Sequence, residues 1–158
     1  GKGSVFSFII SFEVGSAKNT ETRQSEIIAK DFDGHKNVLI VDDNRINQVV
    51  TQRILEKKNF TCEVTTSGEE AIKKIRDHSY NLVLMDINMP GISGLEATRR
   101  IREFDKEVPI LALTAVEIEE IRNKIFEAGM NDIIVKPYDV QQFYQIVYRN
   151  LRVEMVKE

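Results

Sequence analysis

The chain has 158 residues, of which 42% are hydrophobic and 30% charged, and its formal net charge is −3. This composition allows a core and excludes a disordered chain, while the pI of about 5.6 argues against a protein that binds nucleic acid directly. The single cysteine, Cys62, excludes a disulfide framework and a cysteine-rich zinc site, and it favours a reducing, cytoplasmic compartment.

No segment predicts contact with a membrane. The most apolar run, residues 5–14, is interrupted by polar residues and is shorter than the ~20 residues that a spanning helix needs. It does not have the pattern of a signal peptide either. The sequence predicts a soluble chain, and a longer, membrane-anchored parent protein stays an open alternative.

The first 36 residues differ in composition from the rest. Residues 1–14, GKGSVFSFIISFEV, are rich in aromatic and β-branched residues, which is typical of a strand. Residues 15–36 are mostly polar and predict a linker. Because a single strand cannot bury itself, we expect residues 1–14 to be a fragment of a larger domain.

From Asn37 onward, short apolar runs alternate with amphipathic stretches of helical length. The apolar runs predict five strands, which cover residues 38–41, 60–65, 82–85, 108–113 and 133–135. In the second of these, the alternation predicts that three side chains point inward, namely Phe60, Cys62 and Val64.

A helix is predicted after each strand. The first shows apolar residues at helical spacing, namely Ile46, Val49, Val50, Ile54 and Leu55. Capping boxes begin the second and third helices, and they pair Ser67 with Glu70 and Ser93 with Glu96. The fourth covers 117–128 with Gly129 after its end, and the fifth covers 139–151 with Asp139 as its cap.

Five consecutive strand–helix units predict an α/β fold with one parallel sheet. Continuous apolar runs indicate strands that are buried on both faces. Right-handed crossovers then give a doubly wound, five-stranded sheet between two layers of helices, a three-layer α/β/α arrangement. In such sheets the functional site lies at the carboxyl ends of the strands.

Polar residues of distinct kinds follow four of the predicted strands. Asp42 and Asp43 end the first, Asp86 the third, Thr114 the fourth, and Lys136–Pro137 the fifth. We expect three carboxylates, a hydroxyl and an ammonium group to meet at one edge of the sheet.

This set of groups favours phosphoryl chemistry on a carboxylate. Three neighbouring carboxylates repel one another unless a cation is present, and Mg²⁺ is the hard cation that prefers oxygen ligands. An aspartate can act as a nucleophile and form an acyl phosphate. Lys136 and Thr114 would stabilise the charge on the phosphoryl oxygens.

Each residue also has a structural explanation when it is taken alone. Asp42 could cap a helix, Asp86 could belong to a turn, Thr114 with Glu117 forms a capping box, and most lysines are simply solvated. Their joint occurrence, each at its own strand end, favours the functional interpretation.

Residues 37–152 resemble a response-regulator receiver domain of two-component signalling. The resemblance rests on four ordered motifs, which are VLIVDDN (38–44), LVLMDINMPGISGLE (82–96), ILALTA (110–115) and IIVKP (133–137). It implies the flavodoxin-like receiver fold.

The resemblance also implies a role for each site residue. Asp86 would accept a phosphoryl group from phosphohistidine, while Asp43, Asp86 and the backbone carbonyl of Asn88 would bind Mg²⁺. Asp42 would act on the metal through a water molecule. Lys136 would pair with the phosphoryl oxygens, and Thr114 would reorient towards them.

Two further features concern the switch and the peptide bond after Lys136. Many family members have an aromatic residue three positions before this lysine, where the chain has Ile133, so an aromatic switch is left open. Lys136–Pro137 is usually a cis peptide in the family, consistent with the preference of cis bonds for proline.

The head of the chain resembles the C-terminal end of a histidine-kinase ATPase domain. The implied order is a kinase fragment at 1–14, a linker at 15–36, a receiver at 37–152 and a tail at 153–158, as in a hybrid sensor histidine kinase. The implied partners are the kinase's own dimerisation-phosphotransfer domain and a downstream histidine-phosphotransfer protein. Without the rest of the kinase core, this fragment would catalyse only phosphorylation and dephosphorylation of its own aspartate.

Three other functions are alternatives. A stand-alone response regulator would share the same receiver. A haloacid-dehalogenase-type phosphatase would place Asp-x-Asp on its first strand, where this chain has adjacent Asp42 and Asp43. A binding module without phosphoryl chemistry would be expected to lack Asp86, Lys136 or the acidic pair.

Overall fold

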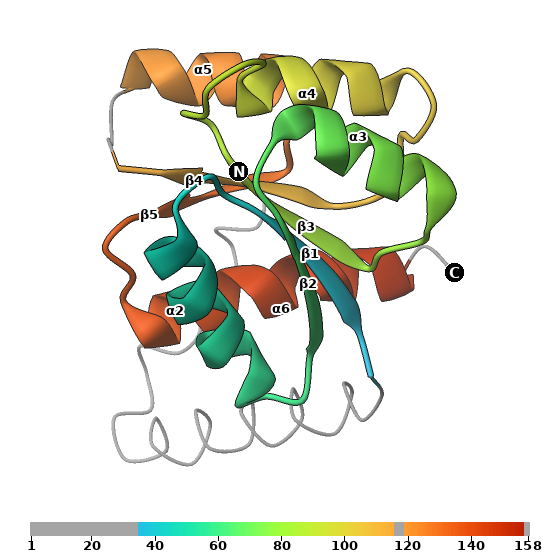
Figure 1. The fold of residues 1–158 in the computed structure, drawn as a ribbon. Helices are drawn as coiled ribbons and strands as arrows, with labels where there is room; N and C mark the ends of the chain where they lie inside the picture. The colour runs from blue at the N-terminus through green and yellow to red at the C-terminus, as the bar shows by residue number, and fades with distance from the viewer. Residues whose placement is uncertain (1–34, 116–118, 157–158) are drawn as a thin grey trace, which may run out of the picture. The chain divides into compact units, whose positions relative to one another are not determined.

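A computed structural model of the chain describes residues 35–115 and 119–156 (Figure 1). The predictions for residues 1–14, and for all but the last two residues of the 15–36 linker, lie outside this range. Among the residues that it describes, no helix is both long and apolar enough to cross a membrane.

Five strands and five helices alternate along this part of the chain. The strands are β1 (Asn37–Val41), β2 (Thr61–Thr65), β3 (Leu82–Asp86), β4 (Ile110–Thr114) and β5 (Asp132–Val135). The helices are α2 (Arg45–Glu56), α3 (Gly68–Asp77), α4 (Gly94–Arg102), α5 (Glu119–Glu127) and α6 (Val140–Val156).

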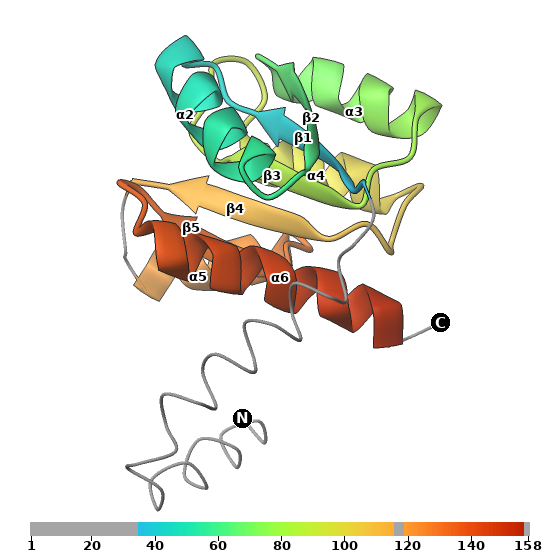
Figure 2. The same ribbon diagram turned by 90° about the horizontal axis from the view of Figure 1, so that it is seen from below.

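The strands form one parallel sheet in the order β2-β1-β3-β4-β5. Helices α3, α4 and α5 cover one face of the sheet, and α2 and α6 cover the other (Figures 1 and 2). The predicted three-layer, doubly wound α/β fold is therefore confirmed. The chain passes from β1 outward to β2 and then returns to β3 on the other side of β1, so the strand order reverses between β1 and β3.

The three inner strands are buried on both faces, as their continuous apolar runs predict. Every residue of β3 and β4 is buried, and so are four of the five residues of β1. The core on the side of α3, α4 and α5 includes Leu39, Val83, Ala97 and Ile125. These strands provide a rigid base for the loops at their carboxyl ends.

Of each predicted capping box, the hydrogen bond to the serine side chain is present. The Oγ atoms of Ser67 and Ser93 accept hydrogen bonds from the N–H groups of Glu70 and Glu96, each at 3.2 Å. The glutamates do not close the boxes, because Glu70 binds the hydroxyl of Thr65 and Glu96 pairs with arginines of its own helix. Asp139 caps α6 through the N–H of Gln142 at 3.0 Å.

Helix α2 turns a different face to the core than its apolar residues suggest. Ile46 is 74% exposed, and Val49 and Val50 are also exposed. The buried face carries Gln48 and Thr51 together with Leu55. The helical spacing predicted the helix correctly, but it did not predict the buried side, because two polar residues have hydrogen-bond partners inside.

The second strand also departs from its predicted pattern. Phe60 is buried, but Cys62 is only half-buried and Val64 is exposed. β2 is one of the two edge strands of the sheet, so the helices cover it less completely than the inner strands. Val64, which the alternation predicted to point inward, is therefore not buried.

Several boundaries shift by a few residues. β4 begins at Ile110, after Pro109, and α6 runs five residues beyond its predicted end to Val156. The predicted capping box of Thr114 and Glu117 includes a residue of 116–118, which lie outside the described range. Gly129 follows α5 with a φ of 105°, as expected of a residue that ends a helix.

Candidate functional site

Three carboxylates meet where the strand order reverses. Asp42 follows β1 directly, Asp43 comes next, and Asp86 is the last residue of the neighbouring strand β3. One oxygen of each carboxylate lies within 4.8 Å of one oxygen of each of the others. Asp42 and Asp86 are buried, whereas Asp43 is exposed. This is the crevice at which open α/β sheets bind ligands.

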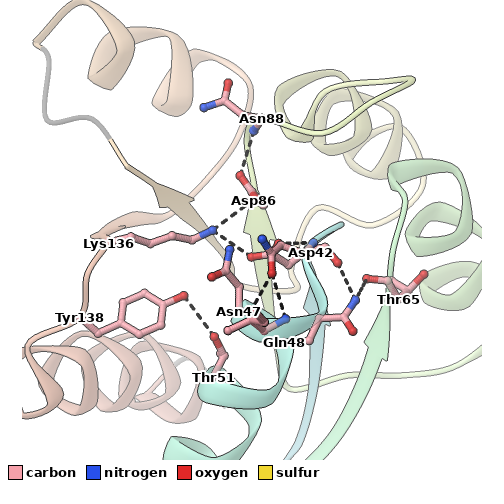
Figure 3. Close-up of polar contacts among 11 residues, drawn as sticks. Asp42, Asn47, Gln48, Thr51, Thr65, Asp86, Asn88, Lys136 and Tyr138 are labelled. Atoms are coloured by element: carbon pink, nitrogen blue, oxygen red, sulfur yellow. Dashed lines mark hydrogen bonds and ion pairs between the residues drawn. The ribbon is translucent and has the colours of Figure 1, made fainter.

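Lys136 reaches this cluster from the far side of β4. Its Nζ lies 2.9 Å from Oδ2 of Asp42 and 3.2 Å from Oδ2 of Asp86 (Figure 3). Its backbone N–H donates to the carbonyl oxygen of Thr114 at 2.7 Å. The side chains of Asp42, Asp86 and Lys136, which the sequence places at three different strand ends, are thus brought together.

Asp42 and Asp86 are held in the same way. Each accepts a hydrogen bond at Oδ1 from the N–H two residues later, Asn44 for Asp42 and Asn88 for Asp86, both at 2.9 Å. Each uses Oδ2 for Lys136. With one oxygen bound to a loop N–H and the other to the ammonium group, neither carboxylate is free to rotate.

Burial and the neighbouring charges shift the pKa values of Asp86 and Lys136. Burial raises the pKa of the Asp86 carboxyl, and this effect outweighs the Asn88 N–H and Lys136, which lower it. Burial alone would lower the pKa of Lys136, but its bond to Asp42 and the charges of both aspartates leave this pKa above its usual value. Lys136 therefore stays cationic, and any additional positive charge would stabilise the ionised carboxylate of Asp86.

Thr114 and Ile133 lie on the two strands beyond β3. Thr114 ends β4 and is buried, and its neighbour Leu113 pairs with Asp86 across the sheet. Ile133 lies in β5 opposite Ala112 and packs, half-buried, against the core. The Lys136–Pro137 peptide is cis, as expected.

Gln48 is a site residue that the sequence did not reveal. Its buried side-chain amide donates to the carbonyl oxygens of Asp42 at 2.5 Å and of Thr65 at 3.3 Å. The N–H of Asp42 donates to the same Thr65 carbonyl at 3.1 Å. Gln48 thus joins the start of α2 to the ends of β1 and β2, and no local motif predicts such a contact.

Gly94 is a second residue without a sequence-based role. A Cβ atom at this position would lie 2.2 Å from the carbonyl oxygen of Asp86. The first turn of α4 therefore packs directly against the backbone of Asp86, and only glycine allows this approach. Gly94 lies within the motif at 82–96, but the motif gave no indication of this contact.

The donor set fits a Mg²⁺ ion. Three carboxylates face one ammonium group, which leaves the cluster short of positive charge. The available ligands are hard oxygens, and one carboxylate is exposed, so that a partly hydrated ion can reach the cluster. Among the described residues this is a group of acids whose ligand atoms lie close enough to share one metal ion.

The fold and the strand-end cluster define a doubly wound α/β domain with an acidic site and a lysine. Residues 38–148 match the response regulator receiver domain family. The chain belongs to this family, whose members take part in two-component signalling.

Its relatives include receiver-containing sensor kinases. Autoinducer 2 sensor kinase/phosphatase LuxQ of Vibrio vulnificus is 34% identical over 144 residues, which cover 90% of this chain and 17% of that protein. Sensor protein GacS of Pseudomonas syringae is 34% identical over 117 residues, which cover 71% of this chain and 13% of that protein. The chain therefore spans only a small part of these relatives.

One solved structure that is similar in fold is described with a bound metal ion. It is the receiver domain of a sensor histidine kinase from Pseudomonas aeruginosa, described with a magnesium ion coordinated in its active-site cleft. It is 32% identical to this chain, with a TM-score of 0.70, and the similarity covers 75% of this chain and 98% of that one.

Proposed function

We propose that this domain accepts a phosphoryl group from phosphohistidine on Asp86 in a two-component phosphorelay. The observation that carries the proposal is the ammonium group of Lys136, held between Asp42 and Asp86 at 2.9 and 3.2 Å beside a third carboxylate. This arrangement provides a nucleophile, a fixed positive charge and a place for a metal ion.

Asp86 is the carboxylate best suited to act as the nucleophile. The side chain of Asp42 is 0% exposed, whereas that of Asp86 is 10% exposed, so an incoming phosphoryl group can reach Asp86. Asp43 is accessible, but the contacts of Lys136 are to the other two carboxylates. Accessibility and a fixed counter-charge coincide at Asp86.

The reaction transfers the phosphoryl group without change in oxidation state. A carboxylate oxygen of Asp86 attacks phosphorus, the P–N bond of the donor breaks, and its electron pair returns to the imidazole nitrogen, which takes up a proton. The product is an acyl phosphate on Asp86. Lys136 is placed to compensate the charge of the phosphoryl oxygens, and the hydroxyl of Thr114 can donate a hydrogen bond to them.

Asp43, Asp86 and the backbone carbonyl of Asn88 would hold Mg²⁺, and Asp42 would act through a water molecule. When bound, the ion supplies positive charge that offsets the repulsion between the carboxylates and the phosphoryl oxygens. The fit of the donor set and the magnesium-containing relative from Pseudomonas aeruginosa support this assignment.

We further propose that the domain belongs to a hybrid sensor histidine kinase. The support is the kinase-like run at residues 1–14 and the similarity to the sensor kinases LuxQ and GacS. Its donor would be the kinase's own phosphohistidine, and its acceptor a histidine-phosphotransfer protein. The genomic sequence upstream of Gly1 tests this: a response regulator without an upstream kinase core would contradict it.

Acetyl phosphate with Mg²⁺ tests the phosphoryl-acceptor function. The unaltered chain should gain one phosphoryl group, and chelation of the metal should prevent the gain. Asp86→Asn should abolish labelling because the nucleophile is lost. Labelling of Asp86→Asn at the unaltered rate would overturn the proposal.

A further inference from the structure

Tyr138 connects the loop that carries Lys136 to helix α2. Its hydroxyl oxygen lies 3.1 Å from Oγ1 of Thr51 (Figure 3). Thr51 is 0% exposed and Tyr138 is half-buried, so water competes little for this bond. Two segments 87 residues apart are thereby joined next to the acidic cluster.

The ring of Tyr138 is held as firmly as its hydroxyl. It packs against Phe143 of α6, with 5.0 Å between the ring centroids and a tilt of 52°. Phe143 is itself buried, at 1% exposure. Only two rotatable bonds separate the ring of a tyrosine from its backbone. Fixing the ring and the hydroxyl of Tyr138 therefore also restricts the position of its backbone.

This anchor lies two residues after Lys136. On the other side, the backbone N–H of Lys136 is bound to the Thr114 carbonyl at 2.7 Å. Lysine has a flexible four-carbon stem, so its ammonium group can meet two aspartates at once only if the base of the stem is well placed. The Thr114 bond and the Tyr138 anchor restrict that base from both sides.

The face of α2 that carries Thr51 also contacts the Asp42 side of the site. Gln48 binds the carbonyl oxygen of Asp42 at 2.5 Å, and Thr51 lies three residues further on, where side chains share a helix face. One helix therefore sets both the loop of Asp42 and the loop of Lys136.

We propose that Tyr138 is a positioning residue for phosphorylation of Asp86: its bond to Thr51 and its packing on Phe143 hold Lys136 between Asp42 and Asp86. The expected effect of Tyr138 on the phosphorylation rate rests on the proposed function of Asp86. The placement of Lys136 can be measured independently of that function.

The test compares three single variants and one double variant. Tyr138→Phe and Thr51→Val each remove one partner of the bond and retain the size of the side chain. Tyr144→Phe is the matched control, because the Tyr144 hydroxyl also joins α6 to α2, through the carbonyl oxygen of Ile54, but does not adjoin Lys136. Tyr138→Phe/Thr51→Val tests whether the two changes act through one bond.

The first measurement is the rate of acetyl phosphate labelling at saturating Mg²⁺. Tyr138→Phe and Thr51→Val should each label about tenfold more slowly, the scale of a small misplacement of a reacting group. The double variant should be no slower than the slower single variant. Tyr144→Phe should lower the urea midpoint to a similar degree but label within about twofold of the unaltered rate.

The second measurement is the ¹³Cε signal of Lys136, assigned by its loss in Lys136→Met. In Tyr138→Phe and Thr51→Val it should move towards the signals of exposed lysines, and in Tyr144→Phe it should stay in place. An unchanged signal and rate in Tyr138→Phe would overturn the positioning role. A moved signal in a chain that acetyl phosphate never labels would retain the positioning role and reject the proposed function.

Discussion

Gly94 lies so close to Asp86 that the end of β3 and the start of α4 determine each other's position. A Cβ atom at position 94 would meet backbone, at 2.2 Å from the Asp86 carbonyl oxygen. Gly94→Ala should therefore destabilise the domain by about 3 kcal/mol or more, at the upper end of overpacking effects. Urea unfolding measures this difference.

Gly68→Ala provides the comparison. The atoms nearest to its added Cβ would belong to side chains, Cγ1 of Ile92 at 2.8 Å and Cβ of Ala97 at 3.1 Å, rather than to the backbone. We expect a loss of only about 1 kcal/mol. If both variants lost the same free energy of unfolding, the Asp86 backbone would be able to shift away from position 94, and the packing of α4 against it would not be tight.

Lys136 is the cation that Asp42 and Asp86 share in the absence of a metal. Lys136→Met leaves two buried carboxylates without this partner, so the free energy of unfolding in EDTA should fall by about 2 kcal/mol, less than for a fully buried pair because the side chain is 17% exposed. Saturating Mg²⁺ should reduce this deficit. Lys73→Met, at an exposed position of α3, is the control, and an equal loss there would contradict the role of Lys136.

Sequence reasoning could place the acidic residues and Lys136 because each follows a predicted strand. In a parallel sheet all carboxyl ends lie at one edge, so spacing along the chain was sufficient. Gln48 and Thr51 could not be identified in this way. Their partners are carbonyl and hydroxyl groups 17 and 87 residues away, and no local pattern encodes such contacts.

Helix α2 also shows that local sequence patterns do not predict distant hydrogen-bond partners. Apolar periodicity predicts that a helix forms, but the buried side depends on which residues find partners inside. Here Gln48 and Thr51 are buried because both are hydrogen-bonded, and Ile46, Val49 and Val50 are left exposed.

Two truncations, one on each side of α2, test which side of the helix is buried. Leu55→Ala removes a side chain that is 0% exposed and should cost about 3 kcal/mol. Val49→Ala, at 42% exposure, should change stability by less than about 0.5 kcal/mol. Urea unfolding of both variants checks the orientation of the helix, and a larger loss for Val49→Ala would mean that the helix is turned the other way.

At the scale of the whole domain, the site joins four of the five strands. Asp42 and Asp86 follow or end β1 and β3, Thr114 ends β4, and Lys136 follows β5. The predicted parallel sheet implied this convergence, because the carboxyl ends of parallel strands lie at one edge of the sheet. The sequence boundaries were less accurate, since Pro109 delays β4 and α6 continues to Val156.

The excess of carboxylates makes the stability of the domain dependent on Mg²⁺. At ten times its dissociation constant, the ion should raise the free energy of unfolding by about 1.4 kcal/mol. Asp43→Asn should weaken this gain. Asp77→Asn removes the same charge from an exposed position in α3 and should leave the gain unchanged; equal effects of the two variants would indicate only general charge screening.

Chemical identification of the phosphorylated residue shows whether Asp86 is the phosphoryl acceptor. After labelling with acetyl phosphate and Mg²⁺, borohydride reduces an aspartyl phosphate to homoserine, which mass spectrometry locates in the sequence. We expect homoserine at position 86 alone. Homoserine at position 42 or 43, or a phosphoryl group on a residue that borohydride does not reduce, would contradict it.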